Sequence, residues 1–514
     1  MEASESRLVL VVRNSTANAA RALSGSLVSA VLPLILAVIL ARAEFAVWAV
    51  VFGIASYVLY LDFGIPTSLQ ALVARHDKAG DAPAAIRVVK SGIAIVMLVA
   101  ALVCAVGVLV GVLYGQIFPD TPPELVGTAS LTLLVILVGQ IANLISAVVS
   151  GYYAGLQRSA EPTRILVPAR VVAIVAAVAI ALAHGDLPIV AVGYSVPLVA
   201  AAVVIFAQFT REAKATPPGP VNAHHTSPTS LIRFSGTLVL WNICLLLISG
   251  TGLVVVGRVD YEFVGAYSIA TIFAVGISTL DGALIASLIP ELGRADVDND
   301  RERLAAVVVR ASRLNSRFAF LLAAGVAALA PLIVVILVHP DQRPLAATLI
   351  ACLALTAAVR LVGAPAALAF IATNTHRKVL WPPVVETVTS VGLAILFGIH
   401  WGAIGVALAG LAGASGGLVL ALVVSPRLTG AFDPAAARLV LNALLLPALP
   451  FLPFAGIAIV VSVTASWTSV FGIVAVVIGF IVSLALLWVL AGSADRASVA
   501  KLMHRARPVN STRE

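Results

Sequence analysis

Charge is scarce in this chain, and its scarcity excludes most soluble classes of protein. Only 11% of the 514 residues are Asp, Glu, Lys or Arg, whereas 61% are hydrophobic. An average soluble domain has about 25% charged residues. Apolar stretches of about 20 residues, the length that an α-helix needs to span a bilayer, recur along the sequence. The composition therefore predicts an all-α, polytopic membrane protein.

Cysteine is also rare, and no catalytic or metal-binding motif is present. Cys104, Cys244 and Cys352 all lie inside apolar runs, which excludes a disulfide framework and a Cys/His metal cluster. The sequence has no Gly-rich phosphate loop and no nucleophile–base motif. Its longest predicted outer connection, Gln116 to Glu124, is too short for a catalytic domain. We therefore expect no catalytic residue, no metal, no cofactor and no enzymatic activity.

The basic residues are distributed as topology signals. The net charge is +8, but Lys and Arg occur singly or in pairs between apolar segments, so nucleic acid is not an expected partner. The opposite connections carry only isolated bases, namely Arg42, Arg258 and Arg343. The positive-inside rule therefore predicts that both termini are cytoplasmic. Residues 1–13 lack the apolar core of a cleavable signal, so the first helix is expected to be retained.

Fourteen membrane helices are predicted by cutting the chain at its charges and Pro/Gly clusters. They cover residues 18–41, 46–73, 88–114, 125–154, 165–184, 187–209, 232–256, 263–290, 311–338, 344–371, 379–399, 401–424, 436–463 and 467–491. The polar, Pro-rich segment after the sixth helix reads as a linker. The expected units are a six-helix lobe (1–210), a cytoplasmic linker (211–230), a second six-helix lobe (231–430), two additional helices (431–492) and a cytoplasmic tail (493–514).

The two predicted lobes share a sequence pattern, which indicates a duplication. Six residues recur 219 positions later: Asp62, Ser68, Leu69, Arg75, Asp77 and Asp81 return as Asp281, Ser287, Leu288, Arg294, Asp296 and Asp300. Shorter matches are Arg21 and Ser24-Gly25 with Arg233 and Ser235-Gly236, and Glu44-Phe45 with Glu262-Phe263. Because six helices separate the copies, the lobes are expected to be parallel repeats related by an axis along the membrane normal.

These features resemble the multidrug/oligosaccharidyl-lipid/polysaccharide (MOP) exporter superfamily, and within it the polysaccharide transporters or Wzx-type flippases. Further motifs that carry the resemblance are Leu61-Asp62-Phe63-Gly64, Gly155-Leu156-Gln157-Arg158 and the segment 401–409. The resemblance implies a bacterial cytoplasmic membrane location and two lobes that rock around a central cavity. It also implies that the first two helices of each lobe line this cavity, and that the two additional helices form a groove for a lipid tail.

The repeated charges are the candidate substrate-binding residues. Asp62 and Asp281 lie 13 residues before Arg75 and Arg294, which places both carboxylates near the bilayer midplane. A charge there is costly, so each is expected to line the cavity or to pair with polar residues in a structural role. Arg21 and Arg233, each followed by a serine (Ser24 and Ser235), match a diphosphate in geometry. The alternative is that both arginines only anchor helix ends by snorkelling.

Other polar residues have no identical partner in the repeat. Arg360 and Glu386 are deep charges of opposite sign, so they are expected either to form a structural pair or to leave Glu386 as a proton site. Arg170 is expected to serve the first lobe similarly. Gln140, Asn143, Ser146 and Ser150 form one helix face, for which interhelical hydrogen bonding is the favoured interpretation over sugar contact.

The resulting hypothesis is a flippase that moves a polyprenyl-diphosphate-linked oligosaccharide across the membrane by alternating access. Its expected partners are this lipid-linked substrate, the bilayer and polysaccharide-assembly enzymes. Two alternatives stay open. One is a cation-coupled multidrug exporter of the same superfamily, and the other is a non-transporting scaffold for cell-envelope enzymes.

Overall fold

The computed structural model describes residues 20–21, 24–25, 28–62, 64–217, 228–285, 301–372, 379–425, 448, 451, 457 and 470–490. Every element within these ranges is helical. Ten of the described segments are long and apolar enough to cross a membrane. The all-α membrane fold is therefore confirmed, whereas the total of fourteen spans stays a prediction. The helix predicted at 436–463 lies almost wholly outside the described residues.

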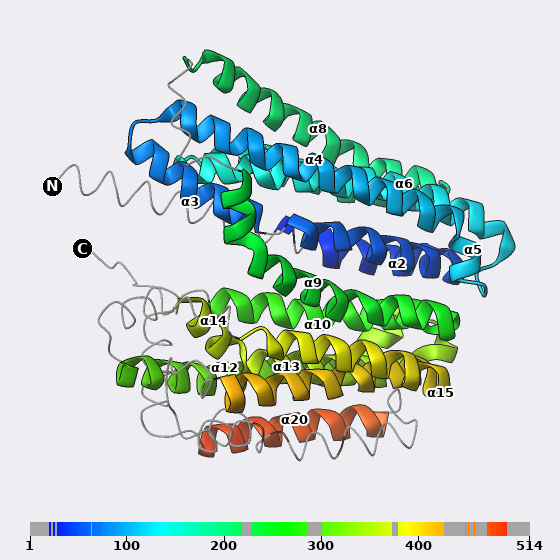
Figure 1. Ribbon diagram of the computed structural model, residues 1–514. Coiled ribbons are helices and arrows are strands. Elements are labelled where there is room, and N and C mark those ends of the chain that lie inside the picture. The colour runs from blue at the N-terminus through cyan, green and yellow to red at the C-terminus, as the bar shows by residue number, and fades with distance from the viewer. Residues whose placement is uncertain are drawn as a thin grey trace, which may run out of the picture.

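The N-terminal lobe contains the helices that precede the predicted linker and forms the upper part of Figure 1. Its elements are the helix Val28–Ile39, α2 (Arg42–Ser56), η1 (Tyr57–Asp62), α3 (Ile65–Lys78), α4 (Ala82–Val112), α5 (Tyr114–Ile117), α6 (Pro123–Gly155), α7 (Ala160–Leu182) and α8 (Leu187–Ala215). Helix α6 packs against α8, α4, α3 and α2, and α7 packs against α8. The lobe is therefore organised around α6.

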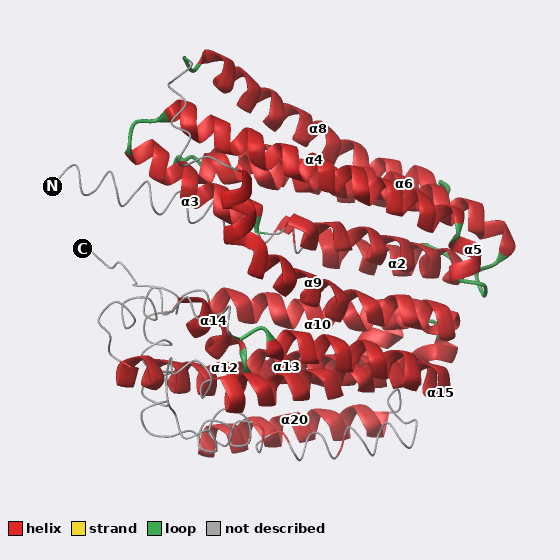
Figure 2. Cartoon of the chain, in the orientation of Figure 1, coloured by secondary structure: helices red, strands yellow, loops and turns green. Residues whose placement is uncertain are grey.

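The C-terminal lobe follows the linker and forms the lower part of Figure 1; Figure 2 shows the same view by secondary structure. Its elements are α9 (Pro228–Val259), η2 (Tyr261–Phe263), α10 (Val264–Ile285), α12 (Arg301–Leu337), η4 (Pro340–Gln342), α13 (Arg343–Val362), α14 (Ala364–Ala372), α15 (Trp381–Val419), η6 (Leu420–Val424) and α20 (Val470–Leu490). Helix α13 packs against α12, α10 and α15. Helix α20 packs against α12, so this additional helix extends the C-terminal lobe.

The second predicted helix, 46–73, is broken where the sequence predicts a continuous span. The chain forms α2, then the 3-10 turn η1, and restarts as α3 after Gly64, whose φ is 69°. Pro66 lacks a backbone donor and its ring crowds the preceding turn, so a regular helix cannot run through this point. Asp62 stabilises the break, because its Oδ1 accepts a hydrogen bond of 2.9 Å from Gly64 N. The equivalent α10 is helical through Asp281, so the repeats differ here.

The predicted helices 379–399 and 401–424 are joined by a minimal turn at Gly402, within α15. Gly402 has φ 58° and ψ −141°, and the chain folds back there into two antiparallel halves. A side chain at this position would lie 2.4 Å from Asp260 Oδ2, so the turn requires glycine. Asp260 Oδ2 accepts a hydrogen bond of 2.9 Å from Ala403 N and thereby holds the turn. Burial raises the pKa of the Asp260 carboxyl above its usual value.

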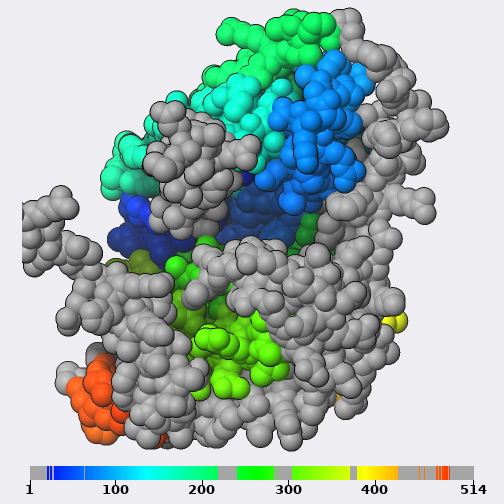
Figure 3. All heavy atoms as spheres, turned by 90° about the vertical axis from the view of Figure 1, so that its left-hand side faces the viewer, coloured from blue at the N-terminus to red at the C-terminus, as the bar shows by residue number. Residues whose placement is uncertain are grey.

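The two ends of the molecule differ in charge. The basic end carries the last residues of α3 and α8, including Lys78 and Lys214, and Figure 3 looks onto it. In that view blue and cyan atoms of the N-terminal lobe lie above green atoms of the C-terminal lobe. The other end, which we call the latch end, carries the start of α2 and the η2 turn. By the positive-inside rule the basic end is expected to be cytoplasmic.

The lobes meet along α2, which lies against α9 and α10. The approach is close: a side chain at Gly53 would lie 2.2 Å from Leu253 Cδ2 across the interface. Tyr57 donates a hydrogen bond from its hydroxyl to Gly250 O. At the latch end, Arg42 Nη2 lies 2.5 Å from Glu262 Oε1 of the other lobe. The interface is therefore closed from the middle of α2 to the latch end.

Candidate functional site

A cavity of about 490 Å³ lies on the side of the N-terminal lobe that faces the C-terminal lobe. This volume is within the range of about 300–1,000 Å³ typical of ligand sites. Its lining comes from the first helix, η1, α3, α6, α7, α8 and α10: Arg21, Gly25, Val28, Ser29, Leu59, Asp62, Pro66, Gln140, Asn143, Ala147, Ser150, Leu166, Arg170, Tyr194 and Val275. Val275 alone in this set belongs to the C-terminal lobe, so the cavity is a feature mainly of one lobe.

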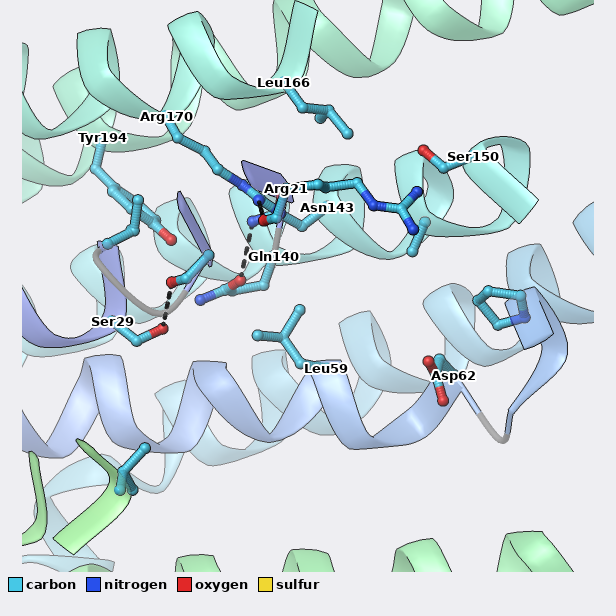
Figure 4. Close-up of a pocket in the computed structure, with 15 residues that line it drawn as sticks. Arg21, Ser29, Leu59, Asp62, Gln140, Asn143, Ser150, Leu166, Arg170 and Tyr194 are labelled. Atoms are coloured by element: carbon cyan, nitrogen blue, oxygen red, sulfur yellow. Dashed lines mark hydrogen bonds between the residues drawn. The ribbon is translucent and has the colours of Figure 1, made fainter. Parts of the chain in front are cut away.

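Two arginines and one aspartate share this cavity (Figure 4). Arg21 extends across it toward Ser150, Arg170 enters from α7, and Asp62 lies on the facing wall. The cavity therefore carries an excess of one positive charge among its lining side chains. Charges are poorly solvated inside a membrane protein, so this excess favours an anionic ligand.

Arg170 is held by the first helix. Its Nη1 donates hydrogen bonds of 2.7 Å to Arg21 O and 2.8 Å to Ser24 Oγ. Ser24 is buried and donates in turn to Arg21 O at 2.9 Å. The predicted substrate residue Ser24 is thus not among the lining residues of the cavity and instead positions Arg170. The next residue, Gly25, has no side chain and leaves room for the guanidinium, which lies 3.4 Å from where a Cβ would be.

The polar row on α6 lines the cavity for most of its length. Gln140, Asn143 and Ser150 belong to the lining, and Asn143 Nδ2 donates to Gln140 Oε1 at 3.5 Å. Ser146 is buried and bonds to the backbone at Ala142 O, 2.8 Å away. Both of these bonds lie within α6, whereas Gln140 also hydrogen-bonds to Tyr194 of α8, so the favoured interpretation of this row, interhelical hydrogen bonding, applies to Gln140. Hydrophobic periodicity identifies a polar helix face but does not tell whether a helix or a cavity lies opposite.

The two repeated aspartates occupy different environments. Asp62 lines the cavity at the helix break. Asp281 lies in α10, is 0% exposed and is not among the lining residues. Of the two expected environments, Asp62 therefore has the cavity, whereas Asp281 lies outside the cavity lining.

The second predicted arginine site consists of Arg233 and Ser235. Arg233 and Ser235 lie in α9, and their side chains lie outside the described residues. Their role opposite Arg21 stays a prediction. No group of three or more His, Cys, Asp or Glu side chains that could hold a metal occurs in the described part of the chain.

Arg360 and Glu386 are in contact inside the C-terminal lobe. Arg360 Nε donates to Glu386 Oε1 at 2.6 Å, which joins α13 to the first half of α15. The Glu386 side chain is 11% exposed, so the carboxylate is largely shielded from solvent. Glu386 also lies against the second half of α15, because a side chain at Gly417 would lie 3.0 Å from Glu386 Oε2.

Removing one partner of this pair is expected to destabilise the protein more than removing both. Glu386→Ala leaves the half-buried Arg360 guanidinium, 32% exposed, without its carboxylate, and the cost is expected to be smaller than the about 3–5 kcal/mol typical of fully buried pairs. The double variant Arg360→Met, Glu386→Leu removes both charges and is expected to lose much less. Thermal unfolding of the purified variants in detergent measures the difference. Equal losses in both variants would contradict a pair that stabilises the lobe.

A second ionic cluster lies at the basic end and gives Arg158, the last residue of the motif Gly155-Leu156-Gln157-Arg158, a structural role. Arg158 Nε contacts Glu161 Oε1 at 2.5 Å and its Nη2 contacts Glu212 Oε1 at 2.9 Å. Its guanidinium also lies 5.2 Å from the centre of the Tyr153 ring. Arg158 thus ties the end of α6 to α7 and α8. The sequence contains this motif but gives no sign of its long-range partner Glu212.

Sequence reasoning missed several lining residues, above all Tyr194 on α8 and Leu59 on η1. Tyr194 is 1% exposed and sits within an apolar helix, so nothing in its local sequence distinguishes it from a packing residue. For Leu59, Pro66 indicates only that the helix is interrupted nearby, not that this side chain lines a cavity.

Comparison with known proteins agrees with this architecture. A sequence model described as "Polysaccharide biosynthesis protein" matches residues 11–296. No curated protein matches by sequence at a significant level. Among solved structures, the lipid II flippase MurJ in an inward closed conformation is similar, with a TM-score of 0.66 and 13% identity over 93% of this chain and 98% of MurJ.

Multidrug transporters share the fold too. An inward-facing MATE family transporter of the MOP superfamily has a TM-score of 0.62 and 16% identity, over 79% of this chain and 95% of its own. The eukaryotic MATE transporter AtDTX14 has a TM-score of 0.62 and 12% identity, over 85% and 98% respectively. At these identities the likeness establishes the fold alone. Because the sequence model covers more than half of the chain, the protein belongs to the polysaccharide biosynthesis protein family, and it has the MOP superfamily transporter fold.

Proposed function

We propose that this protein moves a polyprenyl-diphosphate-linked oligosaccharide, a precursor of surface polysaccharide, across a bacterial cytoplasmic membrane. The observation that carries the proposal is the cavity of the N-terminal lobe, where Arg21 and Arg170 face one carboxylate, Asp62, in a chain of the polysaccharide biosynthesis family. Guanidinium groups match the oxygens of a diphosphate in charge and in geometry. Under this proposal Arg21 and Arg170 hold the diphosphate, and Arg233 approaches it from the second lobe.

The polar surface of the cavity fits a sugar next to this anion. Gln140, Asn143, Ser29 and Ser150 offer amide and hydroxyl groups, which donate to and accept from sugar hydroxyls. Leu59, Val28 and Val275 provide an apolar surface beside them. The lipid tail stays in the bilayer while the headgroup occupies the cavity.

Transport by alternating access requires that the lobes separate at one end while they close at the other. The interface along α2 and the contact between Arg42 and Glu262 close the latch end in this structure. With the basic end in the cytoplasm, the structure corresponds to a state closed to the outside. Polysaccharide-assembly enzymes would supply the substrate on the cytoplasmic side.

The similarity to MATE transporters favours one alternative, a multidrug exporter. The apolar lining and the single carboxylate Asp62 would also accommodate an amphipathic cation. The excess of arginine over carboxylate argues against such a ligand, because two like charges repel a cation in a low-dielectric site.

Depletion of the protein in its own host distinguishes the two functions. A flippase predicts that a lipid-linked oligosaccharide accumulates in the inner leaflet and that surface polysaccharide is lost, with unchanged drug susceptibility. The intermediate is measured by lipid extraction and mass spectrometry, before and after depletion. Drug hypersensitivity with normal surface polysaccharide would instead support the multidrug exporter and overturn the proposal.

A further inference from the structure

Aromatic side chains of the N-terminal lobe lie directly against glycines of the C-terminal lobe. Tyr57 of η1 packs on Gly250 of α9, and its hydroxyl donates a hydrogen bond to the carbonyl oxygen of the same glycine. Phe118, which follows α5, packs on Gly257 of the same helix. Both rings therefore occupy space that a side chain on α9 would otherwise fill.

A third pair of this kind lies at the start of α2. Phe45 is 6% exposed and packs on Gly265 of α10, where a Cβ atom would lie 3.0 Å from Phe45 Cδ1. In each of the three pairs the ring belongs to the N-terminal lobe and the glycine to the C-terminal lobe. The pairs extend along the interface in which α2 lies against α9 and α10 (Figure 1). This interface is therefore built from rings that are seated on glycines.

A methyl group at these glycines would meet the other lobe first. At Gly250 the three nearest atoms all belong to Tyr57, and a Cβ atom there would overlap the ring. At Gly257 a Cβ atom would lie 2.9 Å from Phe118 Cε1 and 3.5 Å from Val50 Cγ2, both in the N-terminal lobe. Extra atoms in a filled space are destabilising. Here the cost falls on the contact between the lobes and not on the interior of either lobe.

The ion pair at the latch end is less able to hold the lobes together. Arg42 and Glu262 are 39% and 59% exposed, and ion pairs in contact with solvent contribute little to stability. Phe118 and Tyr114 are by contrast 0% exposed, with ring centroids 4.9 Å apart. Close packing of such rings against a backbone gives many dispersion contacts and removes apolar surface from water. The rings therefore make the larger contribution to closure.

We propose that these three ring–glycine pairs, which we call the ring lock, hold the two lobes in the state that is closed at the latch end, and that the exposed ion pair contributes less. Opening this end withdraws the rings from α9 and α10 and uncovers their apolar surface. The ring lock is asymmetric, because one lobe supplies every ring and the other lobe every glycine. It concerns the contact between the lobes and does not depend on the chemistry of the transported ligand.

The test measures how often the latch end opens. Thr121 is 3% exposed and lies beside Tyr261 of the other lobe, so a thiol at this position is shielded while the lobes are closed. Thr121→Cys is studied in the full-length protein in lipid nanodiscs, in a background without Cys104, Cys244 and Cys352. The rate of alkylation by a charged maleimide is proportional to the open fraction when closing is faster than alkylation.

The glycine variants are expected to raise this rate in the order of their overlap with the rings. Gly250→Ala should raise it about tenfold or more, because a methyl group there overlaps Tyr57. Gly257→Ala and Gly265→Ala should raise it by smaller factors, since the rings opposite have to shift only slightly. Arg42→Gln is expected to change the rate less than about fivefold.

Gly252→Ala is the matched control. This glycine is on the same helix as Gly250, but a methyl group there would meet Tyr267 of its own lobe. The variant is expected to lower the midpoint of thermal unfolding without raising the alkylation rate. Gly392→Ala, which has open space around the added methyl group, should leave the rate unchanged.

A compensating variant separates opening from misfolding. Tyr57→Leu shortens the side chain opposite the new methyl group, so Tyr57→Leu with Gly250→Ala is expected to bring the rate back toward the wild-type value. A misfolded Gly250→Ala protein would not be rescued in this way. A wild-type rate in Gly250→Ala, an equal rise in Gly252→Ala, or a double variant that stays as reactive as Gly250→Ala overturns the proposal. None of these results bears on which ligand the protein moves.

Discussion

Replacing Arg21 by alanine is expected to lower transport of a polyprenyl-diphosphate-linked sugar at least about tenfold. A charge-assisted hydrogen bond to a buried anion contributes about 1.5–3 kcal/mol, and every 1.4 kcal/mol corresponds to about tenfold in affinity. Arg21 and Arg170 line the same cavity, so Arg21→Ala with Arg170→Ala should abolish transport. The measurement uses proteoliposomes that contain a polyprenyl diphosphate with one N-acetylhexosamine, whose exposure is followed with an external lectin.

Further variants separate the contribution of Arg21 from that of Arg170. Arg21→Lys retains the charge but loses the planar fork, so an intermediate rate is expected. Ser24→Ala removes one hydrogen bond of Arg170 without touching the cavity lining, and a smaller loss is expected. Arg211→Ala, at an exposed position near the end of α8, is the matched control and should transport at the wild-type rate. Wild-type transport by Arg21→Ala would show that this arginine does not hold the diphosphate.

Most of the fold could be predicted from the sequence, because the signals for membrane helices are local and strong. Apolar length marks the spans, and isolated charges mark their ends. The turn at Gly402 lies two residues after the break predicted at His400, between the spans 379–399 and 401–424. The break at Asp62 was missed, although a signal existed: Pro66 has Ile285 as its counterpart 219 positions later, and only the proline interrupts a helix.

The site was less predictable, because it depends on contacts between distant segments. The repeat pointed to Arg21 and Asp62 as a related set, and both do line the cavity. The repeat also pointed to Asp281, which is fully buried and does not line the cavity. Sequence identity between repeats shows common ancestry, but helix breaks and neighbouring side chains decide which copy faces the cavity. Arg170 and Ser24 lie 146 residues apart, and no periodicity relates them.

Chemical cross-linking at the latch end is expected to stop transport completely. Arg42 and Glu262 join the two lobes there, so Arg42→Cys with Glu262→Cys places one thiol on each lobe. A reducible bifunctional thiol reagent that bridges them would hold this end closed and block the outward-facing state. Transport should fall to background and return after reduction. The background must lack Cys104, Cys244 and Cys352, so that the reagent meets only the introduced thiols.

A cross-link within one lobe provides the control for this experiment. Gln342 donates from Nε2 to Glu262 O at 2.5 Å, and both residues belong to the C-terminal lobe. Gln342→Cys with Glu262→Cys can therefore be bridged without restricting the lobes relative to each other, and transport should persist. Loss of transport in both cross-linked pairs would implicate the Glu262 turn itself. Undiminished transport in the Arg42–Glu262 pair, with complete cross-linking shown by mass spectrometry, would mean that the latch end does not open, and alternating access through this interface would be wrong.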